Sequence, residues 1–517
     1  MQIAKRKASI ITIVLIIAFM FITGFTPSVV RAGIMGCIML GARIFYEKQD
    51  FWTSIALSLL IILLENPFSI INIGLQLSYA GTIGIIIFSK SFSEKLKIKK
   101  QNKIIKYILE ALIVCFSAQI LVFPLMIYNF NTVSPYFLIA NLIATPVLAV
   151  IMTWGIITLI ISCIYINLGS VLAIFLNFLL EILIYTSEIV SKLPLSDMVI
   201  ITPYLISIII YYILIFFYKY IPYKKIIKNS KEILIIIFIV ILIFSVHNII
   251  PKDLKIHFID VGQGDSTLII TPSNKKILID GGGSESKDGY DVGENILLPY
   301  LLDRRINYID YIIISHADSD HIAGLFPVLE KIKVKNVILS KQGENSENIE
   351  ILKNILKNKK INVQIVKAGD KIAVGKDICI DILWPQEEQI KENILNNNSI
   401  VLKLIYKKFS CLFTGDIEQI AEEKILSMYK NTTKLKSSIL KIPHHGSKTS
   451  TSENFLREVK PKISLIGVKK DNKFGHPNKI IIKRLKKYNV KIYRTDNMGE
   501  ITIHINDNRK YKNKYTN

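Results

Sequence analysis

The sequence predicts a polytopic α-helical membrane domain in residues 1–250, followed by an α/β domain in residues 251–510. Before residue 250, long apolar runs alternate with short polar clusters, and many runs have the roughly 17–25 residues that a helix needs to cross a bilayer. After Lys252, short apolar runs of strand length alternate with stretches of helical periodicity. A length of 517 residues also exceeds that of one ordinary domain.

We expect about nine membrane-spanning helices in the first part. They cover residues 9–26, 30–46, 51–65, 70–89, 106–129, 135–164, 168–191, 200–219 and 232–249. Lysine clusters lie before the first span, between the fourth and fifth, and between the eighth and ninth. Because Lys and Arg favour the cytoplasmic side, this pattern places the N-terminus on the cytoplasmic side of the cell membrane. The domain after Pro251 is then on the outer face. The first span also resembles a cleaved signal peptide, but the repetition of apolar runs favours a retained helix.

In the second part, twelve short apolar runs predict strands, and other stretches predict helices. The strands are residues 254–260, 266–271, 276–280, 310–315, 335–339, 362–367, 378–383, 399–405, 409–414, 438–442, 462–467 and 499–505. The helices are residues 291–303, 322–332, 347–357, 417–429, 452–459 and 477–487. Strand pairs early in this part, and helices between the later strands, predict two layered sheets with helices outside.

Four potential metal ligands lie within six residues, directly after the apolar run 311–315. They are His316, Asp318, Asp320 and His321. A tight loop at a strand end can present alternating side chains to one side, where their lone pairs converge on a metal. A solvated acidic turn is the alternative, but further candidate ligands follow other predicted strands, so we expect a metal site.

Asp280, Asp416 and the pair His444 and His445 all stand at or just after the ends of predicted strands. Two divalent cations about 3.5–4 Å apart can activate a water and stabilise its attack on phosphorus. Such a pair needs ligands from several strand ends and a carboxylate that bridges the two ions. The pattern therefore predicts a metal-dependent hydrolase.

Several segments of the first part resemble the ComEC family of competence proteins. They are PSVVRA at 27–32 followed by Met35, NP at 66–67 with GLQLS at 74–78, SAQ at 117–119 with Pro124, and NLIATP at 141–146. FIDVGQGDS at 258–266 resembles the same family. The second part also resembles the metallo-β-lactamase superfamily. The resemblance lies in the metal loop (residues 316–321), TGD at 414–416, PHHGS at 443–447 and LIDGG at 278–282. These resemblances cover nearly the whole chain and imply an αββα sandwich with metals at one edge.

The superfamily resemblance assigns seven residues to two divalent metal ions: His316, Asp318, Asp320, His321, Asp416, His444 and His445. The first two would bind one ion and the next two the other, while Asp416 would bridge them and one of the late histidines would complete a site. Asp280 and Asp265 would hold the ligands in place. Zinc is the metal expected first. Asp318 stands where a second His is usual, and a carboxylate in place of an imidazole also suits manganese.

One ligand of the superfamily pattern has no counterpart, because no His lies between His321 and His444. Asn397, Asn398 or Ser399, or a His of the later motif, would have to fill the place; otherwise one metal would bind weakly.

His476 lies in a Gly-His-Pro segment at the start of a predicted helix. Helix starts favour anions, so we expect His476 to bind phosphate or protonate a leaving oxygen, unless it is a surface residue that caps the helix. Ser447, Lys448 and Thr449 are further phosphate-binding candidates. Together with His476, Asp320 and Asp416 form the predicted catalytic set.

The family resemblance implies uptake of single-stranded DNA across the cytoplasmic membrane during transformation, with the metal domain degrading the strand that is not transported. It also implies an outer DNA receptor and a cytosolic ATPase as partners. A hydrolase of another phosphodiester or an ester, and a non-catalytic transport component, stay open as alternatives. Lys and Arg greatly outnumber Asp and Glu in residues 431–517, which suits a polyanion or an anionic membrane surface and equally a solvated lysine-rich surface with no such partner. Longer family members begin with further spans and an OB-like DNA-binding domain, so we expect a short form, a split gene or a truncated gene model.

Overall fold

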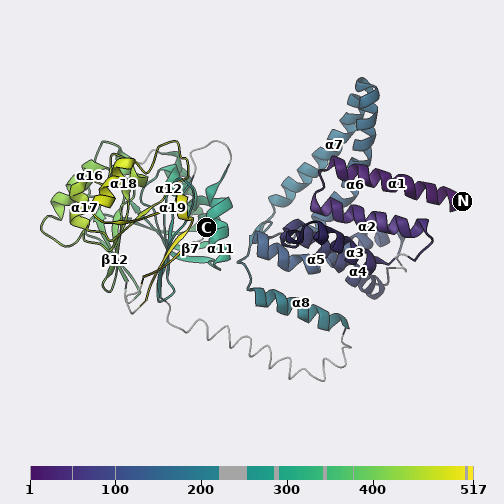
Figure 1. Cartoon of the computed structure of the whole chain (residues 1–517), viewed down its shortest axis with the longest axis horizontal. Helices are drawn as coiled ribbons and strands as arrows, with labels where there is room; N and C mark the ends of the chain where they lie inside the picture. Colours follow the sequence, from purple (N-terminus) through teal and green to yellow (C-terminus); the bar gives the residue numbers. More distant parts are fainter. Residues whose placement is uncertain are drawn as a thin grey trace, which may run out of the picture. The chain divides into compact units, whose positions relative to one another are not determined.

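The computed structural model describes residues 2–48, 50–98, 101–220, 253–283, 290–341, 346–375, 378–506 and 511–515. The chain separates into two compact units, Met1–Tyr220 and Ile221–Asn517 (Figure 1).

The first unit is helical. Its helices are α1 (Gln2–Ile22), α2 (Pro27–Ile44), α3 (Phe51–Glu65), the 3-10 helix η1 (Pro67–Ile71), α4 (Ile73–Lys95), α5 (Lys103–Phe130), α6 (Phe137–Ile164), α7 (Ile166–Ser191) and α8 (Leu205–Tyr220). Two short strands, β1 (Thr132–Val133) and β2 (Met198–Val199), pair antiparallel. A helix lies at each of the first eight expected spans, whereas the ninth, 232–249, lies outside the described residues.

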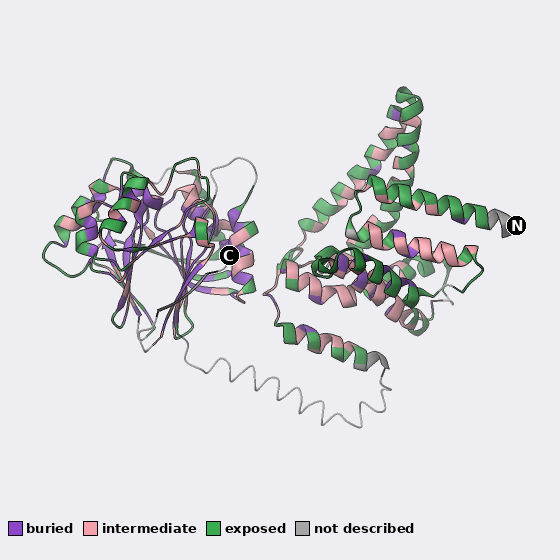
Figure 2. Cartoon of the chain, viewed as in Figure 1, coloured by how far each residue is buried: buried purple, intermediate pink, exposed green. Residues whose placement is uncertain are grey.

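Four helices among the described residues are long and apolar enough to cross a membrane: α4, α5, α6 and α7. Figure 2 shows exposed stretches on α6 and α7, and many of the exposed side chains there are large and apolar. Surfaces of that kind are stable in lipid and costly in water. The predicted α-helical membrane domain is therefore confirmed, while the total number of spans stays a prediction.

Arg31 of the PSVVRA segment is bonded inside the helical unit. Its guanidinium donates to Thr82 Oγ1 at 2.5 Å and lies 5.6 Å from the ring centroid of Tyr79, both on α4. The Tyr79 hydroxyl in turn lies 2.9 Å from Ser58 Oγ on α3. These contacts give polar partners to part of a guanidinium that would be costly in lipid, and they connect α2 and α3 to α4.

The second unit contains two sheets with helices outside (Figure 1). The eight-stranded sheet has the order β17 (Tyr511–Tyr515), β16 (Ile501–Ile505), β3 (Leu254–Phe258), β4 (Thr267–Ile270), β5 (Lys276–Ile279), β6 (Tyr308–Ile313), β7 (Lys333–Ser340) and β8 (Asn362–Val366). The seven-stranded sheet has the order β15 (Lys491–Arg494), β14 (Ile463–Ile466), β13 (Ile439–Lys441), β12 (Phe409–Phe413), β11 (Val401–Tyr406), β10 (Ile378–Trp384) and β9 (Lys371–Val374).

Apolar layers hold this unit together, and two of them bear on the site. The first lies between the sheets and contains Ile256 and Ile277 from one sheet and Leu404 and Cys411 from the other. The second joins the outer face of the seven-stranded sheet to α16 (Gln419–Met428), α17 (Glu453–Val459) and α18 (Lys479–Lys487). The remaining helices are η3 (Gly293–Leu297), α11 (Leu298–Asp303), α12 (Ser319–Ile322), α13 (Leu325–Lys331), α14 (Glu347–Lys359), α15 (Ile394–Asn397), η4 (Pro443–Gly446) and α19 (Thr495–Met498). The predicted sandwich is confirmed.

Every one of the twelve predicted strands is present, and three further strands, β9, β15 and β17, were not predicted. β9 and β15 have only four residues each, and charged side chains open β9 and bound β15, so neither shows an apolar run of strand length. They are the two edge strands of the seven-stranded sheet. Each is held in the strand conformation by hydrogen bonds to its one neighbour, β10 for β9 and β14 for β15.

Parallel pairing positions the site. β5 pairs parallel with β6, and β12 pairs parallel with β13, so the carboxyl ends within each pair meet at one edge of their sheet. Loops leaving these four strands carry Asp280, the segment 316–321, Asp416 and the two late histidines. The topology thus collects residues that lie far apart in the sequence.

Glu500 is the centre of a polar cluster at the start of β16. Its carboxylate accepts from Tyr300 Oη and Arg304 Nη2, both at 2.6 Å, and lies 2.8 Å from His257 Nδ1. Burial alone would raise the pKa of Glu500, but hydrogen bonds from His257 and Tyr300 and the charge of Arg304 lower it to about 2. Because the folded state prefers the ionised group, this contribution to stability is complete above the ordinary pKa and is lost as the pH falls toward 2.

We therefore expect Glu500→Gln to lower the free energy of unfolding by about 1 kcal/mol at neutral pH, an amount reduced for partial exposure. The deficit relative to wild type should shrink between about pH 4.5 and pH 2, where the wild-type carboxyl also becomes neutral. Thermal unfolding of the full chain in detergent at several pH values measures this. Glu388→Gln, an exposed site, is the control. A deficit that does not change with pH would contradict the assignment.

Candidate metal centre

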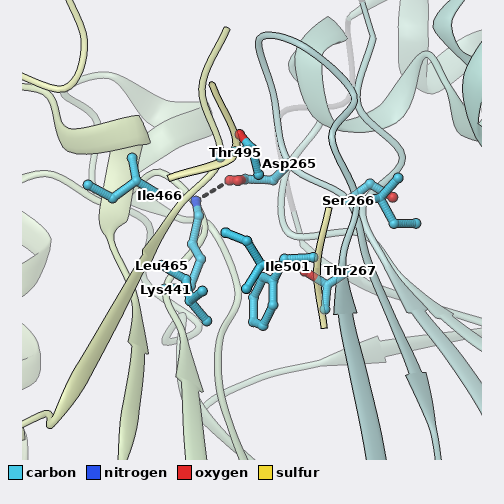
Figure 3. Close-up of a pocket in the computed structure, with 11 residues that line it drawn as sticks. Asp265, Ser266, Thr267, Lys441, Leu465, Ile466, Thr495 and Ile501 are labelled. Atoms are coloured by element: carbon cyan, nitrogen blue, oxygen red, sulfur yellow. Dashed lines mark ion pairs between the residues drawn. The ribbon is translucent and has the colours of Figure 1, made fainter. Parts of the chain in front are cut away.

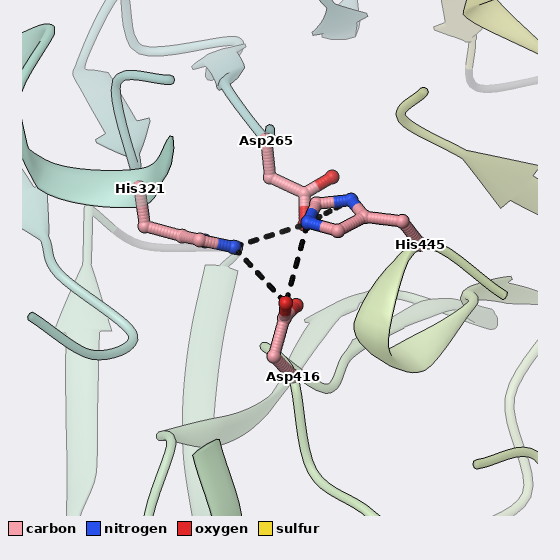
Figure 4. Close-up of side chains that lie close together, drawn as sticks. All are labelled: Asp265, His321, Asp416 and His445. Carbon is pink, nitrogen blue, oxygen red and sulfur yellow. Dashed lines mark ion pairs between the residues drawn. The ribbon is translucent and has the colours of Figure 1, made fainter. Parts of the chain in front are cut away.

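Four side chains from four separate segments converge in the second unit: Asp265, His321, Asp416 and His445 (Figure 4). Each offers one ligand atom, and these atoms all lie within 4.8 Å of one another. Asp265 follows β3, His321 follows β6, Asp416 follows β12 and His445 follows β13. The centre therefore draws on both sheets.

Three buried histidines are oriented as metal ligands are. On each ring, Nδ1 has a partner: Ser315 Oγ at 3.0 Å for His316, Asp280 Oδ2 at 3.0 Å for His321, and Gly467 O at 2.8 Å for His445. On each ring, Nε2 is buried without a hydrogen-bond partner among the described residues. Metal-binding histidines characteristically use one nitrogen for the ion and the other for a supporting hydrogen bond. The donor set therefore fits a divalent metal.

Carboxylates face these free nitrogens in two groups. His445 Nε2 lies 3.3 Å from Asp320 Oδ2 and 3.2 Å from Asp416 Oδ2, and His321 Nε2 lies 3.3 Å from the same Asp416 oxygen. Separately, His316 Nε2 lies 3.4 Å from Asp318 Oδ2. Of the two pairs proposed from the sequence, His316 and Asp318 lie side by side, whereas Asp320 lies beside His445 and His321 lies beside Asp416.

Asp265 lies among the ligands, although the sequence suggests only a supporting role for it. Its Oδ2 is 3.9 Å from His321 Nε2 and 3.8 Å from His445 Nδ1. Its backbone N–H donates to Asp320 O, so the loop that carries Asp265 is bonded to the metal loop. Gly264 makes this approach feasible, since it has a φ of +124° and a Cβ there would lie 2.2 Å from Asp320 O.

Lys441 is a functional candidate that the motifs did not reveal. It ends β13 and is buried, with its ammonium group between two carboxylates of the centre. Its Nζ forms an ion pair with Asp265 (Figure 3), lies 3.3 Å from Asp416 Oδ1 and donates to Gly415 O at 2.9 Å. Burial opposes the charge, but Asp265 and Asp416 raise the pKa of Lys441, so the ammonium persists. A charged residue inside the apolar run 438–442 was the available signal.

The electrostatics of the centre favour ionised carboxylates. Burial raises the pKa of Asp416, but His445, His321 and Lys441 together hold it well below its ordinary value. The pKa of Asp320 is also lowered: burial opposes ionisation, but the imidazole of His445, 3.3 Å away, and the charge of His321 outweigh it. Both groups are therefore anionic at neutral pH and available to a cation.

Asn397, Asn398 and Ser399 do not replace the missing histidine. Asn398 donates to Ile390 O at 2.8 Å and accepts from Ile390 N, and the Asn397 amide oxygen accepts from the backbone of Glu418. Ser399 Oγ accepts from the backbone N–H of Asp416 at 3.3 Å. These side chains hold the surrounding loops, and Ser399 positions Asp416.

His445 faces the carboxylates, whereas His444 points elsewhere. His444 Nδ1 lies 3.5 Å from Glu418 Oε1, and its ring lies 5.7 Å from that of His476. Both consecutive histidines have positive φ, +48° and +51°, a strained conformation for residues with side chains. The turn thus directs one histidine into the centre and its neighbour toward His476.

The predicted phosphate-binding residues lie beside this turn but are not equally placed. Ser447 is buried and its Oγ lies 2.9 Å from Thr449 Oγ1, which also donates to Glu418. Lys448 is exposed.

Burial, with the charges of His445 and His444, lowers the pKa of His476 to about 4, so its imidazole is neutral at pH 7. His476 is thus suited to hydrogen bonding rather than to donating a proton from a cation.

Asp280 orients the metal loop from outside the ligand group. Its Oδ1 accepts from Ser315 N at 2.7 Å, and its Oδ2 contacts Ser315 Oγ and His321 Nδ1.

We expect Asp280→Asn to weaken metal binding about 10–100-fold, because the amide keeps one acceptor but loses the anionic partner of His321. Metal titration of the full chain measures this. Asp310→Asn, another buried aspartate, serves as the control, and equal losses in both variants would contradict a specific role.

Comparisons with known proteins agree with both units. Residues 1–225 match the family model described as Competence protein, and residues 259–468 match that of the Metallo-beta-lactamase superfamily. ComE operon protein 3 of Bacillus subtilis (strain 168) is 26% identical over 523 residues, which cover 99% of this chain and 65% of the relative. Competence protein ComA of Neisseria gonorrhoeae is 27% identical over 242 residues, which cover 47% of this chain and 31% of the relative.

Among solved structures, Igni18, a novel metallo hydrolase from the hyperthermophilic archaeon Ignicoccus hospitalis, matches 48% of this chain and 98% of its own, with 13% identity and a TM-score of 0.33. The chain spans less than two thirds of the length of the curated relatives reported above. From its motifs, its two units and these matches, the chain combines a Competence domain with a metallo-beta-lactamase domain and is similar over nearly its whole length to ComE operon protein 3.

Proposed function

We propose that the chain takes part in the uptake of DNA across the cell membrane, and that its second unit is a metal-dependent nuclease. The single observation that carries the hydrolase assignment is the convergence of His321, His445, Asp265 and Asp416, whose ligand atoms all lie within 4.8 Å of one another. The family supports the link to DNA, since relatives carry the names of competence proteins. The degraded substrate would be the strand that is not transported.

The ligand set suits two divalent ions, zinc or manganese, of unequal affinity. Asp320, His321, Asp416 and His445 would hold one ion, and His316 and Asp318 would hold the other with help from Asp416. The second set is poorer, because no described residue takes the place of the missing histidine and Asp318 is partly exposed. When bound, such ions polarise a phosphoryl oxygen and activate a water at neutral pH.

The protein's own residues would prepare this chemistry. Lys441 pairs with Asp265 and Asp416 and holds both in position, and Asp280 orients the ring of His321. His476 and Ser447 stand beside the centre and would hydrogen-bond phosphate oxygens. The lysine pattern favours an outer-face location for this unit. Single-stranded DNA, an outer receptor and a cytosolic ATPase are the proposed partners.

The full chain in detergent, loaded with manganese or zinc, should cleave labelled single-stranded DNA. Removal of metal with a chelator should abolish cleavage, and added metal should restore it. Hydrolysis of a small chromogenic phosphodiester without cleavage of DNA would favour another phosphodiester as substrate. A steep fall of DNA binding with salt is expected if phosphates are contacted. Absence of bound metal and of all hydrolysis would favour a non-catalytic transport component.

A further inference from the structure

The loop between β14 and α18, residues 467–478, is built around one side chain. Asn472 accepts from the backbone N–H groups of Phe474 and His476 at 3.2 and 3.0 Å, and it donates to His476 O and Lys469 O. These four hydrogen bonds hold the loop against itself. Phe474 and His476 are therefore presented in a defined arrangement.

A row of aromatic rings leads from this loop to the metal centre. The rings of Phe474 and His476 are stacked, with centroids 5.8 Å apart and planes 24° apart. The His476 ring lies 5.7 Å from that of His444, and the His444 ring lies 6.4 Å from that of His445. His445 in turn faces Asp416. Phe474, 48% exposed, is thus the solvent end of a path that begins at the ligands.

The loop that carries the exposed ring holds three lysines and one acidic residue, Asp471. Lys469, Lys470 and Lys473 are exposed on the same loop, and Lys473 Nζ lies 4.9 Å from the centroid of Phe474. The backbone N–H of Lys469 donates to Gln263, so the loop also adjoins the segment that carries Asp265. An aromatic ring flanked by cations at the edge of a metal centre matches the chemistry of a nucleotide, which joins a flat base to a phosphate.

We propose that Phe474 and His476 form a stacking platform for a nucleobase, and that the three lysines bind the adjoining phosphates of a single strand. This proposal rests on the proposed nuclease function and names a recognition subsite for it. A base must leave a duplex to stack on a protein ring, so the platform selects single-stranded over double-stranded nucleic acid. An anionic lipid surface would use the same charges but has no use for a stacked ring pair.

The decisive experiment separates the base from the phosphate. The full chain in detergent, with chelator present to prevent hydrolysis, is titrated with a labelled oligothymidylate and with an abasic strand of the same length. Phe474→Ala should weaken binding of oligothymidylate about tenfold, the value expected for one lost stack. It should change binding of the abasic strand less than about twofold, because that strand has no base to stack. Phe474→Tyr, which keeps the ring, should retain wild-type affinity.

Charge is tested with a matched pair of variants. Lys473→Gln should weaken both strands alike and reduce the salt dependence of binding, whereas Lys357→Gln on α14, also exposed, should change neither. Equal losses on both strands for Phe474→Ala, or none, would overturn the stacking platform. Loss of binding to anionic vesicles without base dependence would assign the ring to a membrane surface instead. Because binding is measured without metal, these outcomes are independent of whether the wild type hydrolyses DNA.

Discussion

Asp416→Asn should abolish metal-dependent hydrolysis, with a loss of about a thousandfold or more. Asp416 Oδ2 faces His321 and His445, and its Oδ1 faces Lys441, so both oxygens are engaged by the centre. An amide carries no negative charge for a cation and would turn a nitrogen toward one of these partners. Loss of a ligand carboxylate from such a centre would remove several kcal/mol of transition-state stabilisation, and each 1.36 kcal/mol is about tenfold in rate.

Metal content and hydrolysis are measured together on the full chain, with a small phosphodiester as substrate. Asp310→Asn is the matched control, because Asp310 is also buried but pairs with Lys275 away from the centre. That control should keep both metal and activity. If Asp416→Asn bound metal and turned over substrate like wild type, the bridging role and the centre built around it would be wrong.

Much of the second unit was predictable because its pattern is local. Apolar runs such as those of β6 and β11 mark buried strands whatever their partners, and the metal loop follows β6 within a few residues. Neighbouring parallel strands have their carboxyl ends at the same edge of a sheet. Ligand residues that directly follow such strands in the sequence therefore lie at that edge. The positions of Asp280 and Asp416 relative to their strands carried that information.

What escaped prediction depends on contacts between distant segments. Lys441 looks like a solvated end of a strand until Asp265 is placed opposite it, and nothing local in the sequence sets that pairing. Whether His444 or His445 enters the centre depends on a hydrogen bond from His445 Nδ1 to Gly467 O, which lies on another strand end. The short strands β9 and β15 likewise take their conformation from their neighbours.

The most informative variant is Lys441→Met, because it separates stability from metal binding. It leaves Asp265 and Asp416 buried without their cation, and a buried charge that loses its partner costs about 3–5 kcal/mol. We therefore expect the unfolding midpoint of the metal-free chain to fall by on the order of 10 °C. Bound manganese or zinc would compensate the same carboxylates, so the deficit should shrink when metal is added.

Lys403→Met is the matched control for this experiment. Lys403 is also buried, but its ammonium donates to the backbone carbonyls of Lys434 and Lys436 at 2.8 and 2.7 Å rather than to a carboxylate of the centre. Its loss should destabilise the metal-free and metal-loaded chain equally. Lys441→Arg, which keeps the charge, should restore part of the stability. If metal rescued neither lysine variant or both alike, Lys441 would be a structural residue with no link to the metal centre.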